Sequence, residues 1–335
     1  MAHGAKEFHR PKGTRELIMR IGQNPAKAIN SIAKPERITV AVLNYIPFMS
    51  GFYSESLDVL QVCLDSAKNQ AGLPFDLMVF DNGSCTEVQQ WLLARLQTKE
   101  IQYLVLSDKN LGKGGAWNQI FGGAPGEIIV YSDSDVLFYP GWLARSVEIL
   151  ETFPKVGMVT ARPFRTREHL YTRTLEWARQ FPEVQIKEGQ LIPWQTFLEF
   201  NLSLGVSEEE IREKYKTSQD FQLTFNGVTA QVGASHWQFT TRKEVITQFL
   251  PFKMDKPMGQ VLQLDASMND SGYLRLMTPD PLAMNMSNTL PGELRRHPLA
   301  DKRAKSGLAQ KVLDLHPVKS VLMRFYNQIF HWYNG

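Results

Sequence analysis

The sequence predicts an α/β protein with a mostly parallel central sheet and helices on both of its faces. From residue 38 onward, short apolar runs typical of buried strands alternate with stretches that have the three-to-four-residue period of amphipathic helices. Each of the first strand-like runs stops abruptly at polar residues. Strands that alternate with helices are usually parallel and buried on both sides, so this pattern gives the fold class.

The alternation is clearest in the first half of the chain. The strand-like runs are ITVAVLNY (38–45), FDLMVF (75–80), IQYLVLS (101–107) and EIIVYS (127–132). Helical stretches connect them: SESLDVLQVCLDSAKNQ (54–70), TEVQQWLLARLQT (86–98) and a third that follows a glycine-rich loop near residue 112. The carboxyl ends of parallel strands share one edge of a sheet, where ligands bind in such folds.

The second half of the chain is less regular. A helix is expected at 143–153, a strand at 156–162, and further strands within 230–245 and 273–279. Residues 165–228 are predicted to be a helical insertion, in which Ser207 and Glu210 have the spacing of a capping box. Pro317 precedes an expected C-terminal amphipathic helix, whose apolar face comprises Val318, Val321, Leu322, Phe325, Ile329 and Trp332.

Composition and cysteine content favour a globular protein in a reducing compartment. The chain has 335 residues, of which 43% are hydrophobic and 21% charged. Cys63 and Cys85 make neither a disulfide framework nor a metal-ligand spacing. No apolar run approaches the ~20 residues of a membrane span, and residues 1–20 are too polar for a signal peptide. We therefore predict a cytoplasmic location.

Positive charge is concentrated at the two ends of the chain. Residues 1–37 and residues 293–335 each contain eight Lys or Arg and three acidic residues, whereas 38–292 contain 21 basic and 28 acidic side chains. Basic ends predict either peripheral contact with an anionic membrane surface or solvated tails. The C-terminal helix could likewise lie in a membrane interface or pack on its own domain. Nucleic acid is not expected, because the body has no basic patch with interleaved aromatics.

Two aspartates follow the fourth predicted strand, in the sequence SDSD (132–135). Carboxylates that repel each other are costly in a core, but Asp133 and Asp135 suit a divalent cation that is shared with phosphate oxygens. The alternative is that Asp133 caps the next helix and Asp135 is solvated.

Two further polar clusters, DNGS (81–84) and NLGKGGAWN (110–118), follow predicted strands. The glycine loop would expose backbone N–H groups to an anion beside Lys113, although many such loops are only turns. Asp81 could accept a hydrogen bond from a nucleobase, or could cap the helix that begins near Thr86.

Together these motifs, in this order and strand context, resemble the nucleotide-sugar half of a GT-A glycosyltransferase of the family 2 type, over residues ~38–160. The resemblance implies a Rossmann-like GT-A fold, a nucleoside-diphosphate sugar as donor, and Mn²⁺ or Mg²⁺. It also implies roles for individual residues. The donor would contact Asn44, Tyr45, Asp81, Gly112, Lys113, Gly114, Gly115, Asn118 and Asp133, while Asp135, with Asp133, would bind the metal.

The second half departs from this family's pattern. An inverting enzyme needs a general base, for which we prefer Asp265 over Asp270, yet the family's usual acidic pair is missing near Gln260 and Val261. The family's histidine ligand is replaced by Asn285, so the metal would be held by Asp135 and the diphosphate almost alone. His236 and Trp237 are candidate sugar or acceptor contacts. A structural histidine and a core tryptophan are the alternatives.

These features divide the chain into a basic arm (1–36), a nucleotide-sugar half (37–160), an acceptor half (161–292) and a basic helical extension (293–335). The predicted activity is metal-dependent, inverting transfer of a sugar to an acceptor hydroxyl of a glycan, a lipid-linked or a small molecule, as in polysaccharide biosynthesis. The alternatives are a nucleotidyltransferase, or a catalytically degenerate binding or scaffold protein.

Overall fold

The computed structural model describes residues 22–29, 31–217, 219–255, 261–290 and 292–294. The predicted C-terminal helix at 317–332 and the first 21 residues of the basic arm lie outside these ranges. In the part of the chain that the structure describes, no helix is long and apolar enough to cross a membrane.

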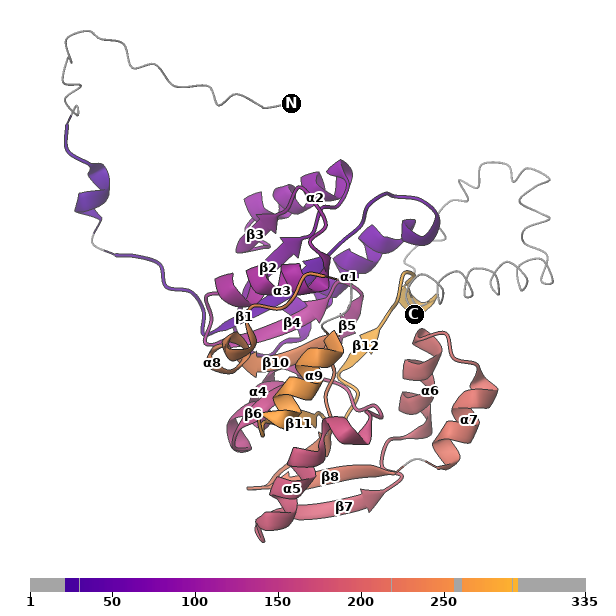
Figure 1. Ribbon diagram of the computed structural model, residues 1–335. Coiled ribbons are helices and arrows are strands. Elements are labelled where there is room, and N and C mark those ends of the chain that lie inside the picture. Colours follow the sequence, from indigo (N-terminus) through magenta and orange to yellow (C-terminus); the bar gives the residue numbers. More distant parts are fainter. Residues whose placement is uncertain (1–21, 30, 218, 256–260, 291, 295–335) are drawn as a thin grey trace, which may run out of the picture.

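A single large sheet of ten strands forms the centre of the described structure (Figure 1), in the order β3-β2-β1-β4-β10-β6-β11-β9-β8-β7. Most of its strands run in one direction, and β10, β9 and β7 run against their neighbours. The predicted α/β class with a mostly parallel sheet is therefore confirmed. The strands are β1 (Ile38–Asn44), β2 (Asp76–Asp81), β3 (Tyr103–Leu106), β4 (Ile128–Asp133), β6 (Val156–Thr160), β7 (Gln185–Gly189), β8 (Asp220–Phe225), β9 (Val228–Val232), β10 (Gln238–Arg242) and β11 (Leu274–Met277).

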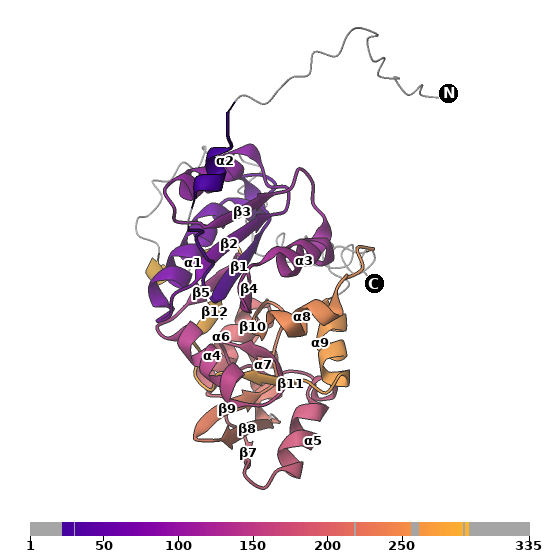
Figure 2. The same cartoon turned by 90° about the vertical axis from the view of Figure 1, so that its left-hand side faces the viewer.

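Helices cover both faces of this sheet (Figure 2). One face carries α1 (Ser56–Gln70), α2 (Thr86–Gln97) and α4 (Trp142–Thr152), and the other carries α3 (Gly112–Gly123), α8 (Lys243–Ile246) and α9 (Val261–Asp270). Two hydrophobic cores result, a first core under α1, α2 and α4 and a second core under α3, α8 and α9. Side chains along β1 alternate between them, because Val40 and Val42 belong to the first core and Ala41 to the second.

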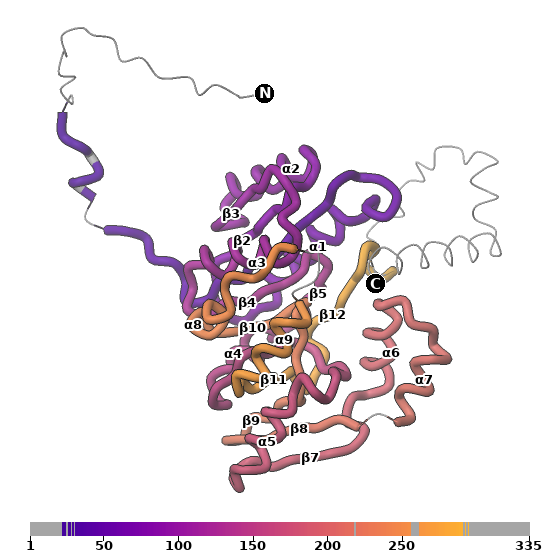
Figure 3. The backbone as a smooth tube through the Cα atoms, in the orientation of Figure 1, coloured from indigo at the N-terminus to yellow at the C-terminus, as the bar shows by residue number. Residues whose placement is uncertain are grey.

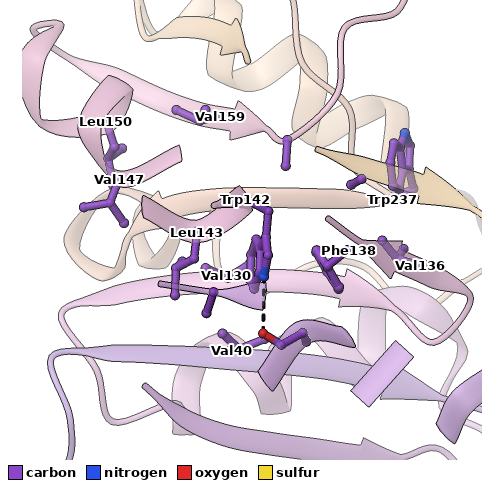
Figure 4. Packing of buried hydrophobic residues seen from close by; sticks show 14 of the residues in the cluster. Val40, Val130, Val136, Phe138, Trp142, Leu143, Val147, Leu150, Val159 and Trp237 are labelled. Carbon is purple, nitrogen blue, oxygen red and sulfur yellow. Dashed lines mark hydrogen bonds between the residues drawn. The ribbon is translucent and has the colours of Figure 1, made fainter. Parts of the chain in front are cut away.

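Aromatic rings fill both cores. In the first core, Trp142 of α4 lies on Phe138 with ring centroids 4.1 Å apart, and its indole Nε1 donates to the Ala67 carbonyl at 3.2 Å (Figure 4). In the second core, Trp117 and Phe121 of α3 contact Tyr131 of β4. The helix that begins at the glycine loop is thus fixed to the strand that ends at the two aspartates.

The segment 165–228 was predicted to be helical. It contains the expected helices, but it also contains strands that extend the sheet. It contains α5 (Thr172–Gln180), α6 (Trp194–Ser203) and α7 (Glu208–Lys216), together with β7 and β8. Figure 3 shows α6 and α7 beside the end of the sheet that β7 and β8 form. Ser207 accepts from the Glu210 backbone N–H at 3.4 Å, as the capping-box spacing predicts.

The parallel register of the first strands brings their polar ends together. Asn44 pairs with Asp81 across β1 and β2, and Leu43 pairs with Asp133 across β1 and β4. A small second sheet, β5 (Val136–Phe138) with β12 (Ala283–Asn285), then carries Asn285 back to the end of β4. The edge predicted to bind ligand is therefore assembled from residues about 240 positions apart.

Candidate active site

A cleft of about 410 Å³ opens at the carboxyl ends of β1, β2 and β4. Its walls come from the loop after β1, the turn after β2, the start of α3, the end of β4 and the turn after β12. Five residues predicted from the sequence line it: Tyr45, Gly112, Lys113, Asp133 and Asp135. The structure therefore brings together most of the motifs that the sequence analysis singled out.

Asn44 and Asp81 lie beneath the cleft and do not line it. Both are fully buried, and the Asn44 amide donates to Asp81 Oδ1 at 2.9 Å and to Ser84 Oγ at 3.0 Å. The other carboxylate oxygen of Asp81 accepts from the Ser84 backbone N–H at 3.1 Å and from the Gln89 amide at 3.3 Å. With its oxygens engaged by protein donors, Asp81 acts here as a clamp between β2 and the turn that leads into α2.

Asn82 and Asn110 shape the wall of the cleft, and sequence reasoning did not assign a role to either. Asn82 Oδ1 accepts from the Leu111 N–H at 2.9 Å, and its amide donates to Asn110 Oδ1 at 3.0 Å. Asn110 Oδ1 also accepts from the Gly112 N–H at 2.8 Å. Their position at the start of loops that follow predicted strands was the available signal, because asparagine side chains there can accept hydrogen bonds from loop N–H groups.

The glycine loop is the first turn of α3, which begins at Gly112. Gly114 and Gly115 are buried inside that turn, and a Cβ at Gly115 would lie 2.7 Å from Leu111 Cβ. Asn118, one turn further, exchanges hydrogen bonds with the Phe252 backbone at 2.9 and 2.7 Å and does not line the cleft. The part of the loop that faces a ligand is thus its beginning, Gly112 and Lys113.

Lys113 neutralises Asp133. Its Nζ lies 2.8 Å from both carboxylate oxygens, and only 6% of its side chain is exposed. The Tyr131 hydroxyl donates to the same carboxylate, and burial, followed by the negative charge of Asp133, raises the pKa of Tyr131 well above its usual value. Asp133 is therefore held in place by protein donors before any ligand binds.

Asp135 has the opposite surroundings. Among the described residues its buried Oδ1 has no hydrogen-bond partner, and its Oδ2 is 3.5 Å from the Asn285 amide nitrogen. Burial, followed by repulsion from Asp133, raises its pKa to about 7. An orphaned carboxylate oxygen at the wall of a cleft is the group that a hard cation would satisfy.

The other predicted ligand, Asn285, presents its amide nitrogen to Asp135, because its oxygen accepts from the Ser287 N–H at 2.8 Å. Its predicted role as a metal ligand would require the amide to rotate. Within the described ranges, no group of three or more His, Cys, Asp or Glu side chains could hold a metal ion. Asp135 fits the cation expected from the sequence, provided that most of the other ligands come from the bound substrate.

The candidates from the second half form a separate cluster. His236 Nδ1 lies 2.8 Å from Asp265 Oδ2, and Asp265 Oδ1 accepts from the Arg275 guanidinium at 2.6 Å. Neither His236 nor Asp265 lines the cleft, and Asp270 is the exposed last residue of α9. Arg275, which sequence reasoning missed, is a charged residue in the apolar strand YLRLM, and that exception to the pattern was the available signal.

Trp237 belongs to the core rather than to an open sugar site. It is 8% exposed and packs near Phe164 and Phe200, with ring centroids 6.4 and 6.2 Å away. The backbone of Trp237 nevertheless matters to the site, because its carbonyl accepts from the Asp133 N–H at 2.9 Å.

Comparison with known proteins finds a family model that matches part of the chain. Residues 51–203 match the model described as glycosyl transferase family 2. An uncharacterized glycosyltransferase from Nostoc sp. is 29% identical over 101 residues, which are 30% of this chain and 31% of the relative. The predicted resemblance to family 2 glycosyltransferases is confirmed.

Two solved structures are similar in part. One is the mannosyltransferase PcManGT from Pyrobaculum calidifontis in complex with GDP-Man and Mn²⁺ (TM-score 0.45, 19% identity, 76% of this chain and 57% of that chain). The other is S. aureus TarS 1-349 (TM-score 0.41, 13% identity, 73% of this chain and 58% of that one).

Proposed function

Taking residues 51–203 as a family 2 glycosyltransferase segment, we propose that the protein transfers a sugar from a nucleoside-diphosphate sugar to an acceptor hydroxyl, with a divalent cation and with inversion. The observation that supports this most is the unpartnered Oδ1 of Asp135, buried at the wall of a cleft that also contains the first turn of α3. A buried carboxylate oxygen without a donor is costly, so its retention here is explained best by a cation that arrives with the donor.

The donor diphosphate would lie against the beginning of α3. Helix N-termini favour anions through their free N–H groups and their dipole, and Gly112 leaves the backbone accessible at this point. Tyr45, partly exposed at the rim, would contact the nucleobase, with Tyr53 edge-on at 6.5 Å between ring centroids. Asn44 and Asp81 would support this end of the cleft from below through their mutual hydrogen bond.

Asp135 would hold Mn²⁺ or Mg²⁺, which supplies Lewis-acid neutralisation of the leaving diphosphate. Lys113 keeps Asp133 oriented and lowers the repulsion that Asp135 would otherwise experience. Asp133 is thereby left to contact the donor ribose with the oxygen lone pairs that Lys113 and Tyr131 do not use.

The acceptor side would be formed by the cluster of His236, Asp265 and Arg275, beyond Asp133. An attacking hydroxyl must lose its proton, and this cluster contains two groups that can accept a proton, His236 and Asp265. The segment 165–228, which extends the sheet next to this region, would shape the choice among a glycan, a lipid-linked or a small-molecule acceptor. Peripheral contact of the basic ends with a membrane remains a prediction.

Calorimetry with a panel of nucleoside-diphosphate sugars, including GDP-mannose and UDP-N-acetylglucosamine, tests this proposal. Each is titrated with and without Mn²⁺ into the wild type, into Asp135→Asn and into Glu183→Gln, a carboxylate-to-amide control on an exposed loop. We expect one nucleotide to bind in a metal-dependent way to the wild type and the control, and at least tenfold more weakly to Asp135→Asn.

Two results would contradict the proposal. If the folded wild type binds no nucleotide sugar, the chain is a binding or scaffold protein on this fold. If binding ignores both the metal and the substitution at Asp135, the metal role is wrong. The anomeric configuration of the product, read by NMR, then tests inversion.

A further inference from the structure

Three side chains from distant parts of the chain meet behind the end of β4. Arg275 of β11 and Asp265 of α9 form an ion pair at 2.6 Å, with 0% and 4% of their side chains exposed. Asp265 in turn contacts His236 at 2.8 Å, and 23% of the His236 side chain is exposed. The cluster therefore runs from a fully buried cation, through a buried carboxylate, to an imidazole that solvent reaches.

Asp265 is badly placed to take a proton directly from a substrate. One carboxylate oxygen accepts from Arg275 and the other faces His236 Nδ1. An acceptor hydroxyl would have to displace one of these partners and enter a site with almost no exposed surface. The arrangement instead fits a carboxylate that orients a histidine, as the aspartate of a Ser-His-Asp catalytic triad does.

The partner of Nδ1 sets the proton position on the imidazole. A carboxylate only accepts hydrogen bonds, so in the neutral imidazole Nδ1 carries the hydrogen and Nε2 keeps its lone pair. Within the described part of the chain, Nε2 has no hydrogen bond in the structure. The ring therefore presents a free basic nitrogen at its solvent-accessible end.

The backbone around His236 is fixed on both sides. Arg275 donates to the Ala234 carbonyl at 2.7 Å, and the Ser235 N–H donates to Thr160 Oγ1 at 2.9 Å. On the other side, the Asp133 N–H donates to the Trp237 carbonyl at 2.9 Å. Since Ser132 pairs with Gln238 in the antiparallel register, this places His236 level with Ser134, which lines the cleft between the two aspartates.

From this geometry we propose that His236 is the general base of the transfer reaction and that Asp265 and Arg275 position it. The inference rests on the proposed glycosyl transfer. As the acceptor oxygen bonds to the anomeric carbon, the bond from that carbon to the diphosphate oxygen breaks and its electron pair leaves with the nucleoside diphosphate. The acceptor proton moves to His236 Nε2, and the imidazolium is stabilised by Asp265 through Nδ1–H.

Two substitutions separate His236 from Asp265 as the base. In His236→Asn, the amide nitrogen replaces Nδ1 as donor to Asp265, so the buried ion pair keeps its neighbour while the basic nitrogen is lost. In Asp265→Asn, Arg275 requires an acceptor, so the amide oxygen faces Arg275 and the amide NH₂ faces His236. Because this NH₂ group needs an acceptor, Nδ1 of His236 gives up its hydrogen and Nε2 carries it instead. Nε2 then has no lone pair with which to accept the acceptor proton.

The assay uses water as the acceptor, so that no acceptor need be known. Release of nucleoside diphosphate is measured with the donor and metal that bind in calorimetry, for the wild type, both variants and His169→Asn, which alters an exposed histidine side chain of the segment 168–170. We expect kcat to fall roughly 10²–10⁴-fold in His236→Asn and in Asp265→Asn, with donor Kd unchanged within threefold and the control at the wild-type rate.

The outcomes distinguish this inference from the proposed function. If the wild type turns over and His236→Asn falls less than tenfold, His236 is not the base, and inactivity of Asp265→Asn alone would then assign that role to the carboxylate. If His236→Asn also loses donor binding or unfolds, its role is structural and the inference is overturned. A wild type that neither binds nor hydrolyses any donor refutes both.

Discussion

Replacement of Asp135 by asparagine is expected to stabilise the metal-free protein at alkaline pH. The pKa of Asp135 is about 7 instead of 3.8, so the folded state retains a proton that the unfolded state releases between these two values. Stability of the wild type therefore falls as pH rises from about 4 to about 7 and is constant above that range. A shift of three units corresponds to about 4 kcal/mol. Because the residue is only partly buried as a whole, we expect a gain of about 2 kcal/mol at pH 8.

Guanidinium denaturation in the presence of EDTA measures this gain. Asp135→Asn should exceed the wild type in free energy of unfolding at pH 8, and the difference should fall to about a quarter at pH 4.5, where the folded-state carboxyl is still protonated. Glu183→Gln, which replaces an exposed carboxylate on a loop, should leave the free energy of unfolding unchanged at both pH values. Saturating Mn²⁺ with the bound nucleotide should shrink this difference, because the wild type gains more stability from binding than the variant does. A gain that is equal at both pH values, or a loss at pH 8, would refute the reasoning.

Three further substitutions test the scaffold of the cleft. Lys113→Met leaves the partly exposed carboxylate of Asp133 without its cation and should cost roughly 2 kcal/mol in urea denaturation at pH 8, and an effect under 1 kcal/mol would show that water solvates that carboxylate instead. Gly83→Ala places a Cβ 2.8 Å from the Lys109 carbonyl carbon at a φ of +86°, and should lower the free energy of unfolding by about 1–3 kcal/mol. The control Gly227→Ala has a similar φ of +79° with nothing within 4 Å, so equal losses in the two variants would mean that the close contact has no effect. Trp142→Phe removes the donor to the Ala67 carbonyl and should cost about 1–3 kcal/mol, and a variant as stable as the wild type would indicate that this carbonyl finds another donor.

The fold of the first half was predictable because local pattern and tertiary position agree there. In β1, β2 and β4 every apolar residue is at least partly buried, and the run ends where the strand ends. The strands of the segment 165–228 were harder to predict, because β7 is an exposed edge strand of sequence QIKEG. This sequence has no alternation of apolar and polar residues that would distinguish it from a loop. Its place in the sheet comes from pairing with β8, a contact between segments about 35 residues apart.

The candidate site shows the same division between local and long-range information. Strand-end position identified the residues that line the cleft, such as Lys113, Asp133 and Asp135. It did not show that Asp81 has both carboxylate oxygens engaged by protein donors. Which side chain is free to meet a ligand depends on neighbours that only the folded chain supplies.

The distribution of partners between Asp133 and Asp135 explains how one site can hold two adjacent carboxylates. Within the residues that the structure describes, the Asp133 carboxylate contacts an ammonium and a phenol hydroxyl, whereas the Asp135 carboxylate contacts only an amide at 3.5 Å. If protein donors neutralised both carboxylates, a cation would gain little by binding. If they neutralised neither, two facing charges would destabilise the end of the strand. Here Asp133 is compensated by protein donors, and Asp135 is left with a raised pKa and one unsatisfied oxygen, Oδ1. A cation that arrives with a diphosphate would relieve the repulsion between the two carboxylates at the place where the leaving group would depart.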